Sequence, residues 1–123
     1  MPLIVQKYGG TSVGSAERIK AVADRIIARV KGGDRLVVVV SAMGQTTDEL
    51  IALAAEMTDE PEAREMDLLL STGEIVTSTL LAMALKHSGQ PALALSGAQA
   101  GIGTDRVYGR ARILKLDPAR VVR

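Results

Sequence analysis

A glycine-rich segment near the N-terminus places the strongest constraint on how this chain can fold. An apolar run at residues 3–5 leads to Lys7, and residues 8–15 then read Tyr-Gly-Gly-Thr-Ser-Val-Gly-Ser. Apolar residues at steps of three and four begin after Ser15 and give one apolar helical face. This order predicts a strand, a glycine-rich turn and an amphipathic helix.

The composition of this turn favours contact with an anion. A turn at a helix N-terminus exposes backbone N–H groups, and glycines let a ligand approach them closely. Lys7 adds a positive charge and Ser12 a hydroxyl, so phosphate handling is one hypothesis and a merely tight turn is the other. The lysine precedes the glycines, unlike in a P-loop, and Gly10 and Gly14 lack the spacing of a dinucleotide fingerprint.

Composition excludes several function classes. The 123 residues correspond to one domain or part of one, and a net charge of +1 with two aromatic residues disfavours a nucleic-acid surface. The absence of cysteine excludes thiolate chemistry, and a single histidine disfavours a histidine metal site or a Ser-His-Asp triad. We see no signal peptide and no apolar run of membrane-spanning length. We therefore expect a cytoplasmic protein with no nucleic-acid or membrane partner.

The first part of the chain predicts a βαβ unit. Ser15 is the expected N-cap of the first helix, and Gly32 with Gly33 should end it. Residues 36–40 form a continuous apolar run, typical of a strand buried on both faces. The spacing predicts a parallel strand pair with a right-handed crossover. Because ligands bind at the carboxyl ends of such strands, residues 41–47 should lie beside the first turn.

Hydroxyl groups in this second segment admit two interpretations. Ser41 directly follows the predicted strand, and Thr46 with Glu49 matches a capping box for the next helix. If Thr46 caps the helix, Thr47 is free to face a ligand. Alternatively, both threonines only cap the helix.

Residues 65–88 form a long, nearly all-apolar helical segment, which predicts a helix buried on all sides. Glu74 lies in its middle, where a carboxylate needs a cation or hydrogen-bond donors. A ligand ammonium group is one candidate partner. The alternative is a capping box of Ser71 and Glu74, if the helix restarts near Gly73.

The last part of the chain is less strongly patterned. Residues 92–95 predict a third short strand, and residues 96–105 predict a glycine-rich loop that ends in Thr104 and Asp105. Because this loop follows a strand, Thr104 and Asp105 are candidate site residues, although a plain surface loop is the alternative. Residues 111–116 predict an edge or hairpin strand.

Asp117 and Pro118 predict a helix start as N-cap and first helical residue. Six residues later the sequence ends, and a helix that short has little to hold it. We therefore expect the sequence to be cut from a longer protein.

Four motifs of this chain resemble bacterial aspartate kinases in the same order and spacing. They are Lys-Tyr-Gly-Gly-Thr-Ser-Val-Gly at 7–14, Val-Ser-Ala-Met-Gly-Gln-Thr-Thr-Asp at 40–48, Ser-Thr-Gly-Glu at 71–74 and Ala-Gly-Ile-Gly-Thr-Asp at 100–105. Together they cover the chain nearly end to end. The first motif is shared across the amino acid kinase family, whereas the combination with Ser-Ala-Met-Gly and Ser-Thr-Gly-Glu is specific to aspartate kinases.

The resemblance implies an α/β fold, a three-layer αβα sandwich with a mainly parallel sheet, here incomplete. Residues 1–123 would be the N-terminal portion of the kinase domain, without its C-terminal nucleotide-binding portion and ACT regulatory domains. The implied reaction is ATP-dependent phosphorylation of the L-aspartate side chain to 4-phospho-L-aspartate, toward lysine, threonine, methionine and diaminopimelate. Mg²⁺ would be held through the ATP phosphates, with no metal ligand from these residues.

The resemblance also assigns roles to residues of this sequence. Lys7 would be catalytic, because it would neutralise charge on the transferring phosphoryl group. The ATP phosphates would be held by Lys7, Tyr8, Gly9, Gly10 and Ser12. L-Aspartate would be bound by Ser41, Thr47 and Glu74, with Glu74 facing the substrate ammonium. No general base is needed, since the nucleophile is already an ionised carboxylate.

One departure limits what the chain can do by itself. The arginine that family members use for the substrate α-carboxylate is absent from the matched positions. We therefore expect the 123-residue chain to be inactive alone and to self-associate through apolar surface, as a homo-oligomer. Two alternative hypotheses are another amino acid kinase, and a non-catalytic shortened paralogue that acts as a binding or assembly module.

Overall fold

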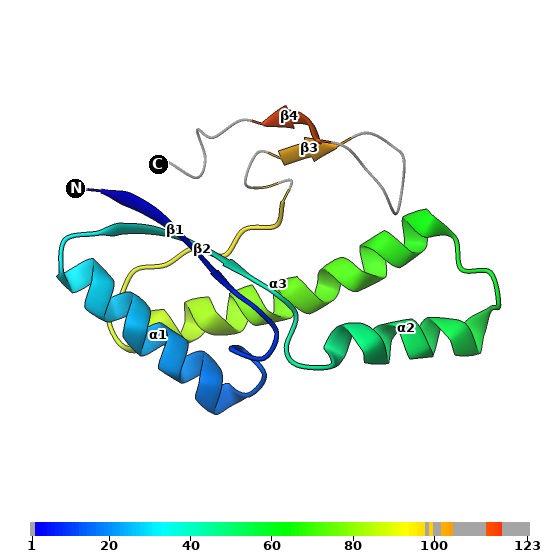
Figure 1. Ribbon diagram of the computed structural model, residues 1–123, viewed down its shortest axis with the longest axis horizontal. Coiled ribbons are helices and arrows are strands. Elements are labelled where there is room, and N and C mark those ends of the chain that lie inside the picture. The colour runs from blue at the N-terminus through cyan, green and yellow to red at the C-terminus, as the bar shows by residue number, and fades with distance from the viewer. Residues whose placement is uncertain (1, 98, 100–101, 105–112, 117–123) are drawn as a thin grey trace.

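The computed structural model describes residues 2–97, 99, 102–104 and 113–116, and these residues form both strands and helices (Figure 1). In chain order they are β1 (Leu3–Tyr8), α1 (Ala16–Lys31), β2 (Arg35–Val40), α2 (Thr46–Met57), α3 (Ala63–His87), β3 (Ile102–Thr104) and β4 (Ile113–Leu116).

The predicted βαβ unit is confirmed. Strands β1 and β2 pair in parallel, in a register that runs from Leu3 opposite Arg35 to Tyr8 opposite Val40. Strand β1 continues beyond the apolar run at residues 3–5 and includes Lys7, so the glycine turn starts only at Gly9.

Both predicted ends of α1 are confirmed. The Ser15 Oγ accepts a hydrogen bond of 3.2 Å from the backbone N–H of Arg18, as an N-cap should. Gly32 is the C-cap, and Gly33 follows with a φ of 101°, a conformation that favours glycine. Glu17 lies in the first turn, where a negative charge is favourable.

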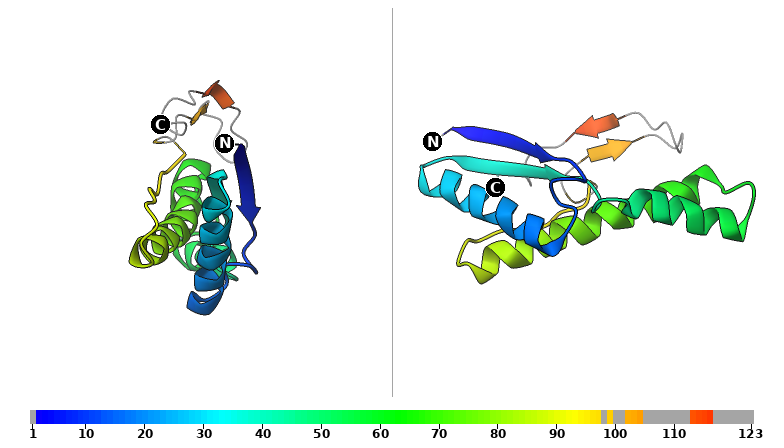
Figure 2. Two further views of the ribbon diagram at one scale, coloured as in Figure 1. Left: turned by 90° about the vertical axis from the view of Figure 1, so that its left-hand side faces the viewer. Right: turned by 60° about the horizontal axis from the view of Figure 1, so that its bottom comes forward.

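Helices α1 and α3 cover one face of the parallel strands (Figure 2). Helices α1 and α3 pack against each other and against β2. Their shared core consists of Val13, Ile19, Val22, Ala23, Ile26, Leu81 and Leu85. On the opposite face Leu3, Val5 and Val39 are 47%, 65% and 47% exposed. The described residues thus form an α/β unit with a parallel sheet and one helical layer of the sandwich.

Helix α3 excludes the capping-box alternative for Ser71 and Glu74. It runs unbroken through Gly73 for 25 residues, so no second helix start exists there. The hydroxyls of Ser71 and Thr72 donate to the carbonyl oxygens one turn earlier, at 2.7 and 2.6 Å, and the predicted capping box with Glu74 is wrong.

Nor is α3 buried on all sides. Its buried residues include Gly73, Thr77, Leu81 and Leu85, at steps of four, while Leu68 and Met83 on other faces are 61% and 64% exposed. The physical reason is that, among the described elements, α1, α2 and β2 pack against α3, and the residues buried on α3 lie along one face. By length and composition alone, α3 also meets the criterion for crossing a membrane, contrary to our expectation that no run approaches that length.

The last part of the described chain differs from the prediction in two places. Residues 92–95 form no strand, and Leu93 is 69% exposed, so its apolar character is not used in a described sheet. The expected strand at 111–116 is confirmed as β4, which forms an antiparallel hairpin with β3. Strand β3 occupies residues for which we predicted a loop, because the pairing with β4 satisfies its backbone. The predicted helix start at Asp117 lies outside the described residues.

Candidate functional site

Two turns meet at the carboxyl ends of β1 and β2. The first turn comprises residues 9–15 and leads into α1, and the second turn comprises residues 41–45 and leads into α2. The Ser41 N–H donates to the Tyr8 carbonyl oxygen at 3.0 Å, and the Gly44 N–H donates to the Gly10 carbonyl oxygen at 3.0 Å. The expectation that the two segments lie side by side is confirmed.

The two turns are so close because glycines occupy the contact. A Cβ on Gly10 would lie 3.0 Å from the carbonyl oxygen of Ala42 and 3.3 Å from that of Gly44. Gly44 itself has a φ of 50°, in the left-handed region. The backbones therefore pack directly on each other, with no side chain between them.

The first turn uses some of its backbone donors internally and leaves others available. The Ser12 N–H donates to the Gly9 carbonyl oxygen at 3.0 Å, and the Gly14 N–H donates to that of Thr11 at 3.3 Å. In the described part of the chain, the N–H groups of Gly10 and Thr11 donate to no protein acceptor. Together with the N-terminus of α1, these groups can bind an anion.

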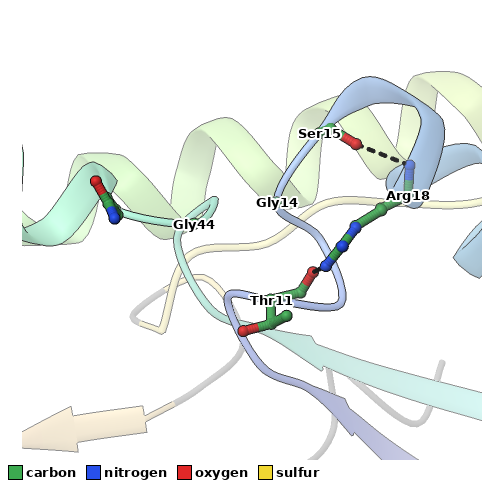
Figure 3. Close-up of a pocket in the computed structure, with 6 residues that line it drawn as sticks. Thr11, Gly14, Ser15, Arg18 and Gly44 are labelled. Atoms are coloured by element: carbon green, nitrogen blue, oxygen red, sulfur yellow. Dashed lines mark hydrogen bonds between the residues drawn. The ribbon is translucent and has the colours of Figure 1, made fainter.

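Arg18 also belongs to this region, and sequence reasoning missed it. Its Nη1 donates to the Thr11 carbonyl oxygen at 2.6 Å, which ties the first turn to α1 (Figure 3). The sequence feature that could have identified Arg18 is its place three positions after the N-cap Ser15, within reach of the turn that precedes the helix. An open pocket of about 560 Å³ lies here, lined by Thr11, Gly14, Ser15, Arg18, Gly44 and Gln45.

The candidate phosphate-binding residues lie at the end of β1 and in the first turn. Lys7 is exposed near the end of β1, opposite Val39. The Tyr8 side chain is half-buried against the core and donates to the Gln6 Oε1 at 3.1 Å, which leaves its backbone as the part at the turn. Gly9 and Ser12 are exposed.

The second turn corrects the predicted capping box. Helix α2 begins at Thr46 after the N-cap Gln45, which makes no side-chain cap, so the threonine hydroxyl is not the N-cap. The N–H of Thr46 instead donates to the Met43 carbonyl oxygen at 2.9 Å, and that of Glu49 donates to the Gln45 carbonyl oxygen at 3.0 Å. Ser41 and Thr47 are both half-buried beside the second turn.

Glu74 is exposed, so the predicted buried carboxylate is wrong. It directly follows Gly73, which is buried against Ala42 of the second turn. Since water solvates it, Glu74 needs no internal cation, but it remains accessible to a ligand.

Of the last two candidates, the described structure places only Thr104. The backbone of Thr104 pairs with Ile113 in the β3–β4 hairpin, and Asp105 lies outside the described residues. Among the described residues, no group of three or more His, Asp or Glu side chains is placed to hold a metal ion.

Comparison with known proteins gives consistent matches along the chain. The model of the Amino acid kinase family matches residues 2–122. A protein named aspartokinase from Geobacillus stearothermophilus is 56% identical over 123 residues, which are 100% of this chain and 30% of that protein. Aspartokinase 2 from Bacillus subtilis is 56% identical over 117 residues, which are 95% of this chain and 29% of that protein.

A solved structure shows the same similarity in three dimensions. The aspartate kinase from Synechocystis superposes with a TM-score of 0.79 and 56% sequence identity, over 85% of this chain and 19% of that chain. The chain thus spans about 30% of the length of the curated relatives it matches.

Proposed function

The chain belongs to the amino acid kinase family, and from this premise we propose that it carries the N-terminal part of an aspartate kinase site. The reaction transfers the γ-phosphoryl group of ATP to the side-chain carboxylate of L-aspartate and releases ADP. The product is 4-phospho-L-aspartate. The proposal concerns the whole enzyme, of which residues 1–123 form one portion.

The contact between the two turns is the observation that carries this proposal. Phosphoryl transfer is catalysed mainly by positioning and by electrostatic stabilisation, so the donor and acceptor sites must adjoin. The hydrogen bond of 3.0 Å from the Gly44 N–H to the Gly10 carbonyl oxygen holds the two turns in contact. One turn can then hold phosphate while the other holds the acceptor.

The first turn is the proposed site for the ATP phosphates. The N–H groups of Gly10 and Thr11 and the N-terminus of α1 favour negative charge. The exposed ammonium of Lys7 can reach a phosphoryl oxygen and offset the charge that develops during transfer. The proposed phosphate-binding residues are Lys7, Tyr8, Gly9, Gly10 and Ser12. Mg²⁺ enters with the nucleotide, bound to its phosphates.

The second turn and α3 are the proposed site for L-aspartate. Ser41 and Thr47 supply hydroxyls beside the second turn, and exposed Glu74 supplies a carboxylate for the substrate ammonium. The substrate side chain has an ordinary pKa of about 3.9 and is ionised at neutral pH. It attacks without losing a proton, so these residues bind and orient it.

We also propose that the protein acts in the cytoplasm as a homo-oligomer. The support for association is the apolar surface that the described residues expose on β1 and α3, including Val5 and Met83. The support for the compartment is the biosynthetic reaction proposed above.

Ligand titration of the ¹⁵N-labelled 123-residue chain tests the proposed function. MgATP should shift the amide resonances of residues 9–14, and L-aspartate should shift those of residues 41–47. Lys7→Ala should weaken MgATP binding, whereas Lys20→Ala, which removes an exposed charge from α1, should not.

Two results would argue against the proposed function, and a third would contradict the expected inactivity of the chain. A response to L-glutamate but not L-aspartate would favour another amino acid kinase. A lack of response to both amino acids and to MgATP would favour the binding or assembly module. Turnover of ATP above background by the purified chain would contradict our expectation that it is inactive alone.

A further inference from the structure

Helix α3 packs closely against the second turn at Gly73. A Cβ on Gly73 would lie 2.8 Å from the Ala42 Cβ and 3.6 Å from the Thr46 Cγ2. Real Cβ atoms essentially never come within 3.0 Å of another heavy atom, so only glycine allows α3 to lie at this distance. Ala42 is 4% exposed and is therefore enclosed by this contact.

The position of this glycine within α3 makes the close approach specific. Glycine is unfavourable in a helix interior, because it loses more backbone freedom than other residues. Gly73 nonetheless lies inside an unbroken helix of 25 residues, on the same buried face as Thr77 and Leu81. Glycine thus occurs inside α3 at a point where the helix backbone packs against the Ala42 side chain.

The backbone of Ala42 also lies close to the first turn. The Ala42 carbonyl oxygen lies 3.0 Å from the position that a Cβ on Gly10 would occupy. Gly44, two residues after Ala42, donates its N–H to the Gly10 carbonyl oxygen. Ala42 is thus held between Gly73 of α3 and Gly10 of the first turn. A shift of α3 by the size of one methyl group must move the second turn or carry Glu74 away from it.

We propose that Gly73 and Ala42 form a spacer pair that positions Glu74 relative to Ser41 and to the first turn. The assignment of a ligand to this arrangement rests on the function proposed above, whereas the packing does not. Both are positioning residues, and neither touches a ligand. The Ala42 methyl group, with no side chain opposite it on Gly73, sets the separation between α3 and the second turn.

Variants that remove the methyl group from residue 42, add one at residue 73, or do both test the spacer pair. The variants are Gly73→Ala, Ala42→Gly and the double variant Gly73→Ala/Ala42→Gly, each as the full ¹⁵N-labelled chain. Gly73→Ala should shift the amide resonances of residues 41–47 and of Gly10. It should also raise the exchange rate of the Gly44 N–H by roughly tenfold or more, as expected for overpacking. The double variant should return both observables close to the wild-type values.

Ligand titration separates positioning from plain structural support. Gly73→Ala should weaken L-aspartate binding more than MgATP binding, and the double variant should restore it. If the wild-type chain does not bind L-aspartate, the proposed function fails for this chain, while the amide spectra still decide whether the spacer exists.

Two results would overturn the spacer. One is a Gly73→Ala spectrum with unchanged second-turn resonances and an unchanged Gly44 exchange rate. The other is a double variant as perturbed as Gly73→Ala. If Gly73→Ala does not fold, recovery of folding in the double variant supports the spacer, and failure to recover overturns it.

Discussion

The backbone N–H of Gly44 donates a hydrogen bond of 3.0 Å to the carbonyl oxygen of Gly10, and this bond joins the two turns that follow the parallel strands. Both partners are glycines, and each would meet strain or contact if it carried a side chain. The relative position of the turns is therefore set by backbone atoms.

Gly10→Ala should destabilise the chain, because its Cβ would lie 3.0 Å from the Ala42 carbonyl oxygen, a backbone atom that cannot easily move. Overpacking of this kind lowers the free energy of unfolding by about 1–3 kcal/mol. The control is Gly9→Ala, whose Cβ meets nothing within 4 Å. Urea denaturation should separate the two variants, and equal midpoints would contradict the prediction.

Ser15→Ala should weaken α1, because it removes the acceptor of the Arg18 N–H at the N-cap. The expected loss in the free energy of unfolding is about 1 kcal/mol. Ser71→Ala is the matched control, since the Ser71 hydroxyl donates only to a carbonyl oxygen within α3. Thermal unfolding followed by circular dichroism gives the midpoint temperature of both variants. A lower midpoint for Ser71→Ala than for Ser15→Ala would contradict a stabilising role of the Ser15 cap.

Arg18→Ala should loosen the first turn, because the guanidinium no longer donates to the Thr11 carbonyl oxygen. Arg18 is exposed, so the free energy of unfolding should fall by only about 0.5–1 kcal/mol. The sharper readout is hydrogen exchange of the Gly14 N–H, which should become faster. Arg25→Ala on the same helix is the control, and equal exchange rates of the Gly14 N–H in both variants would show that the Arg18 side chain does not hold the first turn.

The exposed apolar surface should make the chain associate as its concentration rises. Val5 is 65% exposed on β1, and Met83 is 64% exposed on α3. Val5→Thr and Met83→Gln reduce apolar area without a new charge and should move the association to higher concentration. Sedimentation velocity measures this shift, with Glu17→Gln as a polar control. A wild-type chain that stays monomeric throughout would show that the surface does not drive association.

Local patterns in the sequence were sufficient for the first βαβ unit and for the meeting of the two turns. The helical period after Ser15, its hydroxyl cap and the glycines at 32 and 33 define α1, because these signals act within one turn of the backbone. The parallel orientation of β1 and β2 follows from the crossover helix between them. The adjacency of the turns follows in the same way, since parallel strands end at the same edge.

Only the tertiary structure decided where Glu74 lies, that α3 continues through Gly73 and that Arg18 holds the first turn. A sequence pattern shows which sides of a helix are apolar, but not which sides pack against a neighbouring element. The apolar residues around α3 predicted burial on all sides, whereas its contacts with α1, α2 and β2 bury only part of its surface. Likewise, the lack of a side chain on Gly73 is a helix-breaking signal in the sequence, whereas in the fold it permits contact with Ala42, 31 positions away in the numbering. Local chemistry therefore determined the elements and their order, and long-range packing determined their exposure, because burial depends on atoms that are distant in the chain.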